Sequence, residues 1–132
     1  MTGSAECPAN FTYVPGTHSC YFLSDFQADW TESRAWCLRA GADLAVFESN
    51  NEYVAAKGAF DPIDAWIGLR DIIGNNNGWK WVRTENTPLF TAWKRREPSS
   101  TRERCAMILS RGTWNDARCK FQYNFLCEYQ LY

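Results

Sequence analysis

The residues best suited to covalent or metal chemistry in this chain are its six cysteines. They are Cys7, Cys20, Cys37, Cys105, Cys119 and Cys127. No pair has the Cys-x-x-Cys spacing and His18 is the single histidine, so a zinc site or a thioredoxin-like redox site lacks ligands. Three disulfides formed in an oxidising compartment explain the even number better, and they predict a secreted, extracellular protein. The spacing alone leaves the pairing open.

A second group with chemical potential is a basic segment between positions 94 and 111. Its cations are Lys94, Arg95, Arg96, Arg102, Arg104 and Arg111, and its carboxylates are Glu97 and Glu103. The segment carries a charge of +4 in a chain whose formal net charge is −1. Such a cluster is either a solvated charged surface or a site for sulfate, phosphate or carboxylate, which the arginine fork binds well. The candidate contacts for an anionic glycan are Arg95, Arg96, Arg102 and Arg104.

Catalysis has little support in the sequence. Glu97 and Glu103 could in principle act as an acid–base pair, but His18 has no nearby nucleophile and no phosphate-binding glycine loop is present. We therefore expect no enzymatic activity. The overall charge gives no reason to expect a nucleic-acid partner. No apolar run approaches the ~20 residues of a membrane-spanning helix, so we expect no membrane insertion.

The elements that hold these residues are expected to form one domain. A length of 132 residues, an aromatic content of 16% and seven tryptophans favour a single folded globule. We expect the domain to span residues 7–132, with residues 1–6 as a leader or an added remnant because that segment is short and polar. Asn10-Phe11-Thr12 is an N-glycosylation sequon, which fits secretion.

Two helices are predicted, over about residues 29–40 and 50–60. Each begins with a capping pair, and the pairs are Asp29 with Glu32 and Ser49 with Glu52. The first helix is expected to stop at Gly41. The residues expected on the inner faces are Trp30, Cys37 and Ala40 in the first helix, and Tyr53, Ala56 and Phe60 in the second.

Four short strands are predicted from aromatic or β-branched runs bounded by polar turns. They cover residues 19–26, 66–69, 106–109 and 125–129. Between Leu69 and Cys105, glycine, asparagine and proline residues interrupt every regular pattern. We expect a long irregular loop there, of the kind that is usually functional. Two helices, short antiparallel strands and a long loop describe an α+β fold.

Five short motifs follow one another along the chain. They are Trp66-Ile67-Gly68-Leu69, Gly78-Trp79-Lys80-Trp81-Val82, Glu97-Pro98-Ser99, Glu103-Arg104-Cys105 and Gly112-Thr113-Trp114-Asn115-Asp116. Together with the six cysteines, this ordered set resembles the C-type lectin-like domains from Cys7 to Glu128. The resemblance implies the C-type lectin-like fold, with two helices, small antiparallel sheets, a long ligand-binding loop and three disulfides.

The resemblance also implies structural roles. The implied disulfides are Cys37 with Cys127, Cys105 with Cys119, and Cys7 with Cys20 as the extra bridge of the long form. Trp66, Trp79 and Trp81 belong to the core signature and are expected to pack in the core. Trp93 and Trp114 flank the loop and are expected to support it rather than to stack on a sugar.

The resemblance further implies a calcium site. Calcium prefers about six to eight oxygen ligands, which sugar-binding members supply from a loop Glu-Pro-Asn, a later Glu and the Asn-Asp of Trp-Asn-Asp. The ligands carried over by position, for both calcium and carbohydrate, are Glu97, Ser99, Glu103, Asn115 and Asp116. A cis bond before Pro98 would turn the side chains on either side toward one ion, and two vicinal sugar hydroxyls would complete the shell.

Serine replaces the family's asparagine at position 99. Its side chain is shorter, so we expect calcium affinity at the weak end of extracellular sites, about 10⁻⁴ to 10⁻³ M. Glu97, rather than glutamine, resembles the mannose, fucose and N-acetylglucosamine class more than the galactose class. A second calcium site found in some relatives is expected to be absent, because Ser100 and Arg104 stand where its acidic ligands would be.

Two functional hypotheses follow. The first is a calcium-dependent lectin that binds cell-surface or microbial glycans, with Ca²⁺ as its cofactor. The second is a calcium-independent domain of the same fold that binds a protein or an anionic glycan. The nearly complete ligand set favours the first, whereas Ser99 and the arginines favour the second. Neither hypothesis specifies a sugar or an oligomeric state.

Overall fold

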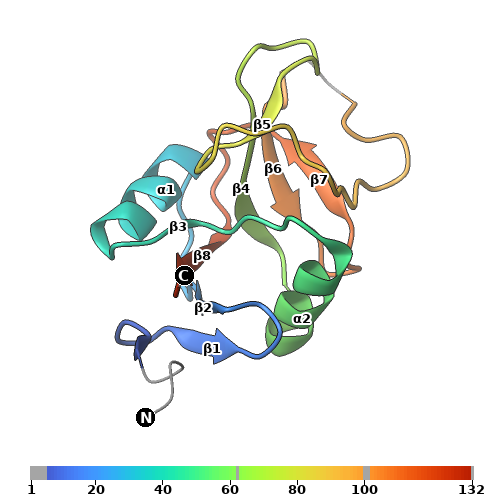
Figure 1. Cartoon of the computed structure of the whole chain (residues 1–132). Helices are drawn as coiled ribbons and strands as arrows, with labels where there is room; N and C mark the ends of the chain where they lie inside the picture. The colour runs from blue at the N-terminus through green and yellow to red at the C-terminus, as the bar shows by residue number, and fades with distance from the viewer. Residues whose placement is uncertain (1–5, 62, 100–101, 132) are drawn as a thin grey trace.

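A computed structural model of the chain describes residues 6–61, 63–99 and 102–131 (Figure 1). Within these ranges there are two helices, α1 (Trp30–Arg39) and α2 (Asn50–Phe60). The strands are β1 (Thr12–Val14), β2 (Ser19–Leu23), β3 (Asp43–Leu44), β4 (Ala65–Asp71), β5 (Trp79–Trp81), β6 (Cys105–Ile108), β7 (Trp114–Ala117) and β8 (Asn124–Gln130). The expected α+β architecture is confirmed. The leader or remnant predicted at residues 1–6 falls mostly outside the described residues.

The strands form one connected sheet. Its order is β1-β2-β8-β4-β6-β7, with β3 beside β8 and β5 beside β4. All pairs are antiparallel except β4 and β8, which run parallel with Trp66 opposite Phe125. The sequence predicts only antiparallel strands, and this one parallel pair joins the strands of the chain ends to those around the long loop. Figure 1 shows β5 and the loop that follows it at the end of the molecule opposite β1.

The four predicted strands are present as β2, β4, β6 and β8, with bounds shifted by one to three residues. The sequence does not predict β1, β3, β5 and β7. These strands are two to four residues long, and a run this short shows no measurable alternation of apolar and polar residues. Their pairing is therefore set by neighbouring strands rather than by local pattern.

The core lies on both faces of the sheet because side chains alternate along each strand. On β8, Leu126 packs into one cluster, which also holds Tyr53 and Ala56 of α2. Its neighbours Phe125 and Cys127 pack into the other cluster, with Trp30 and Cys37 of α1. The two helices therefore cover opposite faces of the sheet. Neither described helix is long and apolar enough to span a membrane.

The helix boundaries follow the predicted caps. The Asp29 carboxylate accepts a hydrogen bond from the Glu32 backbone N–H (2.8 Å), and the Ser49 hydroxyl accepts one from the Glu52 N–H (3.2 Å). Gly41, with φ +78°, follows the last turn of α1 in the left-handed conformation that glycine tolerates.

The predicted inner faces are mostly correct. Trp30 and Cys37 of α1 are buried, as are Tyr53 and Ala56 of α2. The prediction for Ala40 is wrong, because this residue is the half-buried C-cap of α1 and the third buried position is Ser33. Phe60 is only half-buried but packs against the core.

Three disulfides are formed, with the pairing that the family resemblance implies. Cys7–Cys20, Cys37–Cys127 and Cys105–Cys119 have Cα–Cα distances of 5.7, 5.5 and 5.3 Å. Cys37–Cys127 joins α1 to β8 across a sequence separation of 90 residues, which stabilises the fold by about 4–5 kcal/mol in the chain-entropy model. Cys105–Cys119 connects the start of β6 to the segment after β7, so it fixes the edge of the loop region.

Asp71, at the end of β4, organises the turn that leads to β5. It is fully buried, and its carboxylate accepts hydrogen bonds from the backbone N–H groups of Gly74 (2.9 Å), Asn76 (2.8 Å) and Gly78 (3.0 Å). Its backbone also pairs with Arg104, whose carbonyl accepts from the Asp71 N–H at 2.9 Å. One side chain thus orders a turn next to the long loop.

We predict that Asp71→Asn lowers the free energy of unfolding by about 1–3 kcal/mol, because an amide nitrogen replaces an acceptor of a buried backbone N–H. The matched control is Asp64→Asn, since Asp64 is exposed and accepts one bond, from the Ser110 N–H at 2.9 Å. The control should lose less than about 1 kcal/mol. Chemical denaturation with the disulfides intact measures both values, and equal losses would contradict this role of Asp71.

Candidate ligand-binding site

The long loop is anchored on Trp114, the first residue of β7. Trp114 is fully buried and its ring contacts aromatic rings at centroid distances of 5.6–6.3 Å. Those rings belong to Phe47, Tyr53, Trp81, Phe90 and Trp93. The expected role of Trp114 in supporting the loop is confirmed.

The other tryptophans pack as predicted. Trp66 and Trp81 are buried, and Trp79 is half-buried against the core. Trp93 is also half-buried, with its ring 4.9 Å from that of Trp79 and 6.0 Å from that of Trp114. Trp93 therefore belongs to the packing that holds the loop.

Backbone hydrogen bonds attach the loop to β7 beside this aromatic cluster. The Trp114 N–H donates to the Ala92 carbonyl at 2.7 Å, and the Lys94 N–H donates to the Trp114 carbonyl at 2.7 Å. Trp93 and Trp114 thus form an isolated parallel bridge. The loop runs as an additional strand for this short distance and then leaves the sheet.

The segment after this bridge carries the predicted ligands. The Glu97 N–H donates to the Lys94 carbonyl at 2.9 Å, which closes a turn. The Glu97–Pro98 peptide bond is cis, as the family resemblance implies. The Ser99 N–H then donates to Asp116 Oδ2 at 2.9 Å. The loop is therefore attached to β7 on both sides of Pro98.

Three of the five predicted ligands contact one another. The Glu97 side chain lies close enough to Asp116 and to Ser99 for both to shift its pKa, and Asp116 is fully buried. Glu103 is half-buried and close enough for its charge to act on Glu97. Asn115 is half-buried on β7 next to Asp116, and within the described residues no hydrogen bond links its side chain to the other four.

The carboxylates of this group disfavour one another's ionised form. Burial raises the pKa of Glu97 above its ordinary value, as do the hydrogen bond with Asp116 and the charges of Asp116 and Glu103, whereas the hydrogen bond with Ser99 lowers it. Burial and the charge of Asp116 also raise the pKa of Glu103, and the charge of Arg118 opposes this. The site therefore concentrates negative charge that a cation would relieve.

The donor set fits a hard divalent cation. Carboxylate, amide and hydroxyl oxygens are the ligands that Ca²⁺ prefers. Glu97 Oε1 is buried and accepts no hydrogen bond from the described residues, so an acceptor is available at the centre of the group. Among the described residues, no three His, Cys, Asp or Glu side chains form a group that could hold a metal by themselves.

The four candidate arginines separate into two pairs. Arg95 and Arg96 are exposed on the turn before Glu97. Arg102 and Arg104 instead line a cleft. The expected absence of a second calcium site depends on Arg104 and on Ser100, and Ser100 lies outside the described residues.

The sequence analysis misses the other cations of this cleft, which we call the basic cleft. It is lined by Arg70, Arg102, Arg104, Arg118, Cys119 and Lys120. Arg118 and Lys120 flank Cys119, which the implied disulfide places beside Cys105 and hence beside Arg104. That pairing is the one signal in the sequence that could have identified them.

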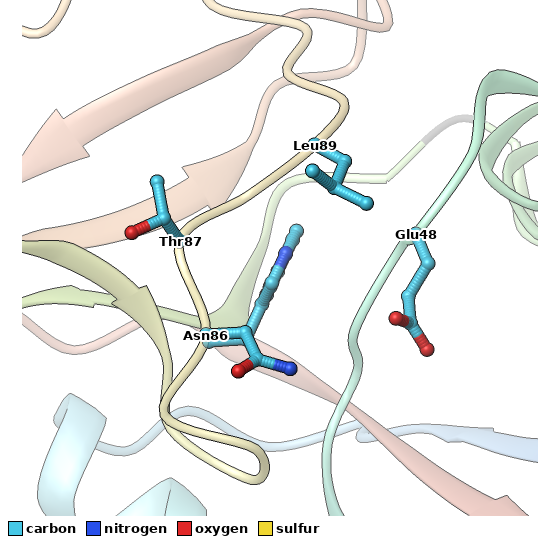
Figure 2. A pocket seen from close by; sticks show the side chains of 5 residues that line it. Glu48, Asn86, Thr87 and Leu89 are labelled. Atoms are coloured by element: carbon cyan, nitrogen blue, oxygen red, sulfur yellow. The ribbon is translucent and has the colours of Figure 1, made fainter.

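A different hollow, of about 250 Å³, lies between the segment before α2 and the loop after β5. Figure 2 shows Asn86, Thr87 and Leu89 on the loop and Glu48 on the segment across from them. None of the predicted site residues lines this hollow. It does not belong to the candidate site.

Comparisons with known proteins agree with this architecture. The sequence pattern of the family described as "Lectin C-type domain" matches residues 26–129. Asialoglycoprotein receptor 1 of Mus musculus is 33% identical over 133 residues, which covers 95% of this chain but only 45% of the receptor. The chain thus spans less than half the length of that relative.

Solved structures give the same assignment. The C-type lectin domain of murine dendritic cell inhibitory receptor 2, in complex with an N-glycan, superposes with a TM-score of 0.81 at 32% identity, covering 95% of this chain and 99% of that domain. A calcium-independent type II antifreeze protein superposes with a TM-score of 0.79 at 22% identity, covering 94% of both chains, and shows the shared fold alone.

The homologues are carbohydrate-binding proteins and not enzymes, in agreement with the expectation of no catalytic role. The matched region includes α1, the long loop and the sheet strands from β3 to β8. The chain belongs to the C-type lectin domain family.

Proposed function

We propose that this chain is a calcium-dependent carbohydrate-binding domain. The observation that carries the proposal is the buried, unbonded Glu97 Oε1 in a group of carboxylates that repel one another. An unpaired buried carboxylate oxygen is costly, and coordination to a cation removes that cost.

The ligands in this proposal are Glu97, Ser99, Glu103, Asn115 and Asp116. Bound calcium supplies a positive charge to which two vicinal sugar hydroxyls can coordinate. The Glu97 carboxylate accepts a hydrogen bond from one of these hydroxyls, and the Asn115 amide donates one to a hydroxyl oxygen. Sugar binding then depends on the metal, because the same side chains orient both.

The sugar class follows from Glu97. A glutamate at this position resembles the mannose, fucose and N-acetylglucosamine class, and the murine relative is described in complex with an N-glycan. We propose glycans of cell surfaces or microbes as the partners. The three disulfides favour an extracellular location. Asn10 is exposed, and its glycosylation remains a prediction.

A calcium-independent function is the second candidate. Ser99 is exposed and its shorter side chain weakens the ligand set. The antifreeze protein demonstrates that the fold itself does not require calcium. The basic cleft offers a site for anionic glycans or proteins that needs no metal.

A glycan array probed in millimolar calcium and again in chelator separates these functions. We predict binding to mannose, fucose or N-acetylglucosamine conjugates in calcium and its loss in chelator. Asp116→Asn is predicted to abolish the calcium-dependent signal because it removes a ligand charge. Its matched control is Asp64→Asn, outside the site. Binding that survives chelator would contradict the calcium-dependent proposal.

Ser99→Asn is predicted to tighten calcium binding, because asparagine supplies a carbonyl oxygen that reaches further than the serine hydroxyl. From a starting dissociation constant of about 10⁻⁴ to 10⁻³ M, we expect an improvement of about tenfold, the effect of one ion–oxygen contact. Calorimetric titration with calcium measures it. The control is Ser110→Asn at another exposed serine. An unchanged or weaker affinity in Ser99→Asn would remove position 99 from the site.

Calcium affinity is predicted to fall on acidification. The pKa of Glu97 and that of Glu103 are raised above the ordinary value of 4.5 in the metal-free protein. Calcium binds the ionised carboxylates, so protons compete with it once the pH drops below these raised values. As the pH is lowered, the dissociation constant for calcium, measured by titration at a series of pH values, should therefore begin to rise while the pH is still above 4.5. A constant affinity down to pH 4.5 would contradict this carboxylate set.

A further inference from the structure

The basic cleft is a concentration of positive charge that the calcium proposal leaves unused. It has a volume of about 240 Å³, and five of its six lining residues are cations. Arg70 is the second-to-last residue of β4, Arg102 and Arg104 precede β6, and Arg118 and Lys120 follow β7. Three chain segments thus contribute to one small hollow through the ends of three neighbouring strands.

Carboxylates do little to neutralise these cations. The direct ion pairs of the described residues are Arg34–Asp43, Lys57–Asp61 and Arg83–Glu128, and none involves Arg70, Arg104, Arg118 or Lys120. The nearby Asp71 carboxylate already accepts three backbone N–H groups. The charge of Glu103 acts on Arg118, but the cations of the cleft outnumber it, so a bound anion would lower the charge repulsion further.

Two of the arginines are held in place before any ligand arrives. The Arg104 Nε donates to the Asp71 carbonyl at 3.1 Å. The Arg70 guanidinium lies 5.1 Å from the centroid of the Trp30 ring. Burial lowers the pKa of Arg70, and the charges of Arg104 and Arg34 lower it further. The Cys105–Cys119 disulfide connects the two segments that carry the remaining cations. Such preorganisation reduces the entropy lost on binding.

The cleft adjoins the proposed calcium site along the chain. Glu103 stands between Arg102 and Arg104, and Asp116 precedes Arg118 by two residues. The charge of Arg118, a residue of the cleft, acts on Glu103, a residue of the proposed calcium site, so the two sites are neighbours in space. We propose that the basic cleft binds a sulfate or phosphate ester carried by the glycan whose hydroxyls occupy the calcium site.

This inference rests on the proposed function, and it goes beyond it by naming a charged substituent. A tetrahedral ester offers several oxygens, which suits several arginine forks approaching from different sides. An ester at carbon 6 of N-acetylglucosamine leaves the vicinal hydroxyls at carbons 3 and 4 free for the metal. One sugar can therefore occupy both sites.

The test compares three conjugates of N-acetylglucosamine: unsubstituted, 6-sulfated and 6-phosphorylated. Binding to the intact domain is measured in saturating calcium at low and at high salt. We expect one or both esters to bind about tenfold more tightly than the unsubstituted sugar, the size of one charge-assisted contact. The gain should shrink at high salt because the cleft is open to solvent.

The double variant Arg118→Gln/Lys120→Gln removes two exposed cations from the cleft. It should lower the ester preference to about twofold or less while binding the unsubstituted sugar like the parent. Arg118 offsets only part of the increase in the pKa of Glu103. Removing its positive charge from beside the carboxylates does not weaken cation binding at the calcium site. The matched control is Arg95→Gln/Arg96→Gln, which removes the same charge from outside the cleft and should keep the preference.

The outcomes are distinguishable. Equal affinity for all three conjugates would overturn the cleft proposal while leaving the calcium site intact. An ester preference lost in the Arg95/Arg96 variant but kept in the Arg118/Lys120 variant would also overturn it. Absent binding of the unsubstituted sugar would contradict the proposed function, and the affinities of the two variants for the esters would still report on the cleft. The preference of sulfate over phosphate, or the reverse, identifies which ester the cleft selects.

Discussion

Trp114 connects the core to the ligand loop in two ways at once. Its ring lies among aromatic side chains from the segment before α2, from α2 itself, from β5 and from the loop. Its backbone N–H and carbonyl bond to loop residues on either side of Trp93. A long loop with little regular structure has few ways to offset its loss of conformational entropy. In this chain, the buried aromatic area and two short backbone hydrogen bonds offset that entropy loss. The next turn can therefore hold Glu97 and Ser99 next to Asp116.

This anchoring explains how opposite charges occupy adjacent positions. Carboxylates near the ends of β6 and β7 lie by the loop, where the Ser99 N–H bonds to Asp116. Cations near the same strand ends line the basic cleft, where Arg104 bonds to the Asp71 backbone carbonyl. The Cys105–Cys119 bridge holds both strand ends together. A cation in one place and an anion in the other would each relieve local repulsion. The same short stretch of sheet can therefore serve a metal and a charged sugar substituent.

The parts of this fold that sequence reasoning predicts well are those with local physical causes. Both helices follow from Asp29 and Ser49 as caps, and the long strands follow from their apolar runs. Short strands depend on their partners, as β3 does on β8, and no local sequence pattern predicts this pairing. The family resemblance supplied the disulfides and the cis bond before Pro98. The cleft could not be predicted from charge along the chain, because Arg70 and Arg118 join it only through strand pairing and a disulfide.

The central claim is that Glu97, Ser99, Glu103, Asn115 and Asp116 hold one calcium ion. A crystal structure of the domain grown in excess calcium, with an anomalous difference map, tests it most directly. The account predicts a peak among these side chains, with Glu97 Oε1 among ligand oxygens at about 2.3–2.6 Å. A map from calcium-saturated crystals with no peak there, or with an ion only at other residues, would contradict it.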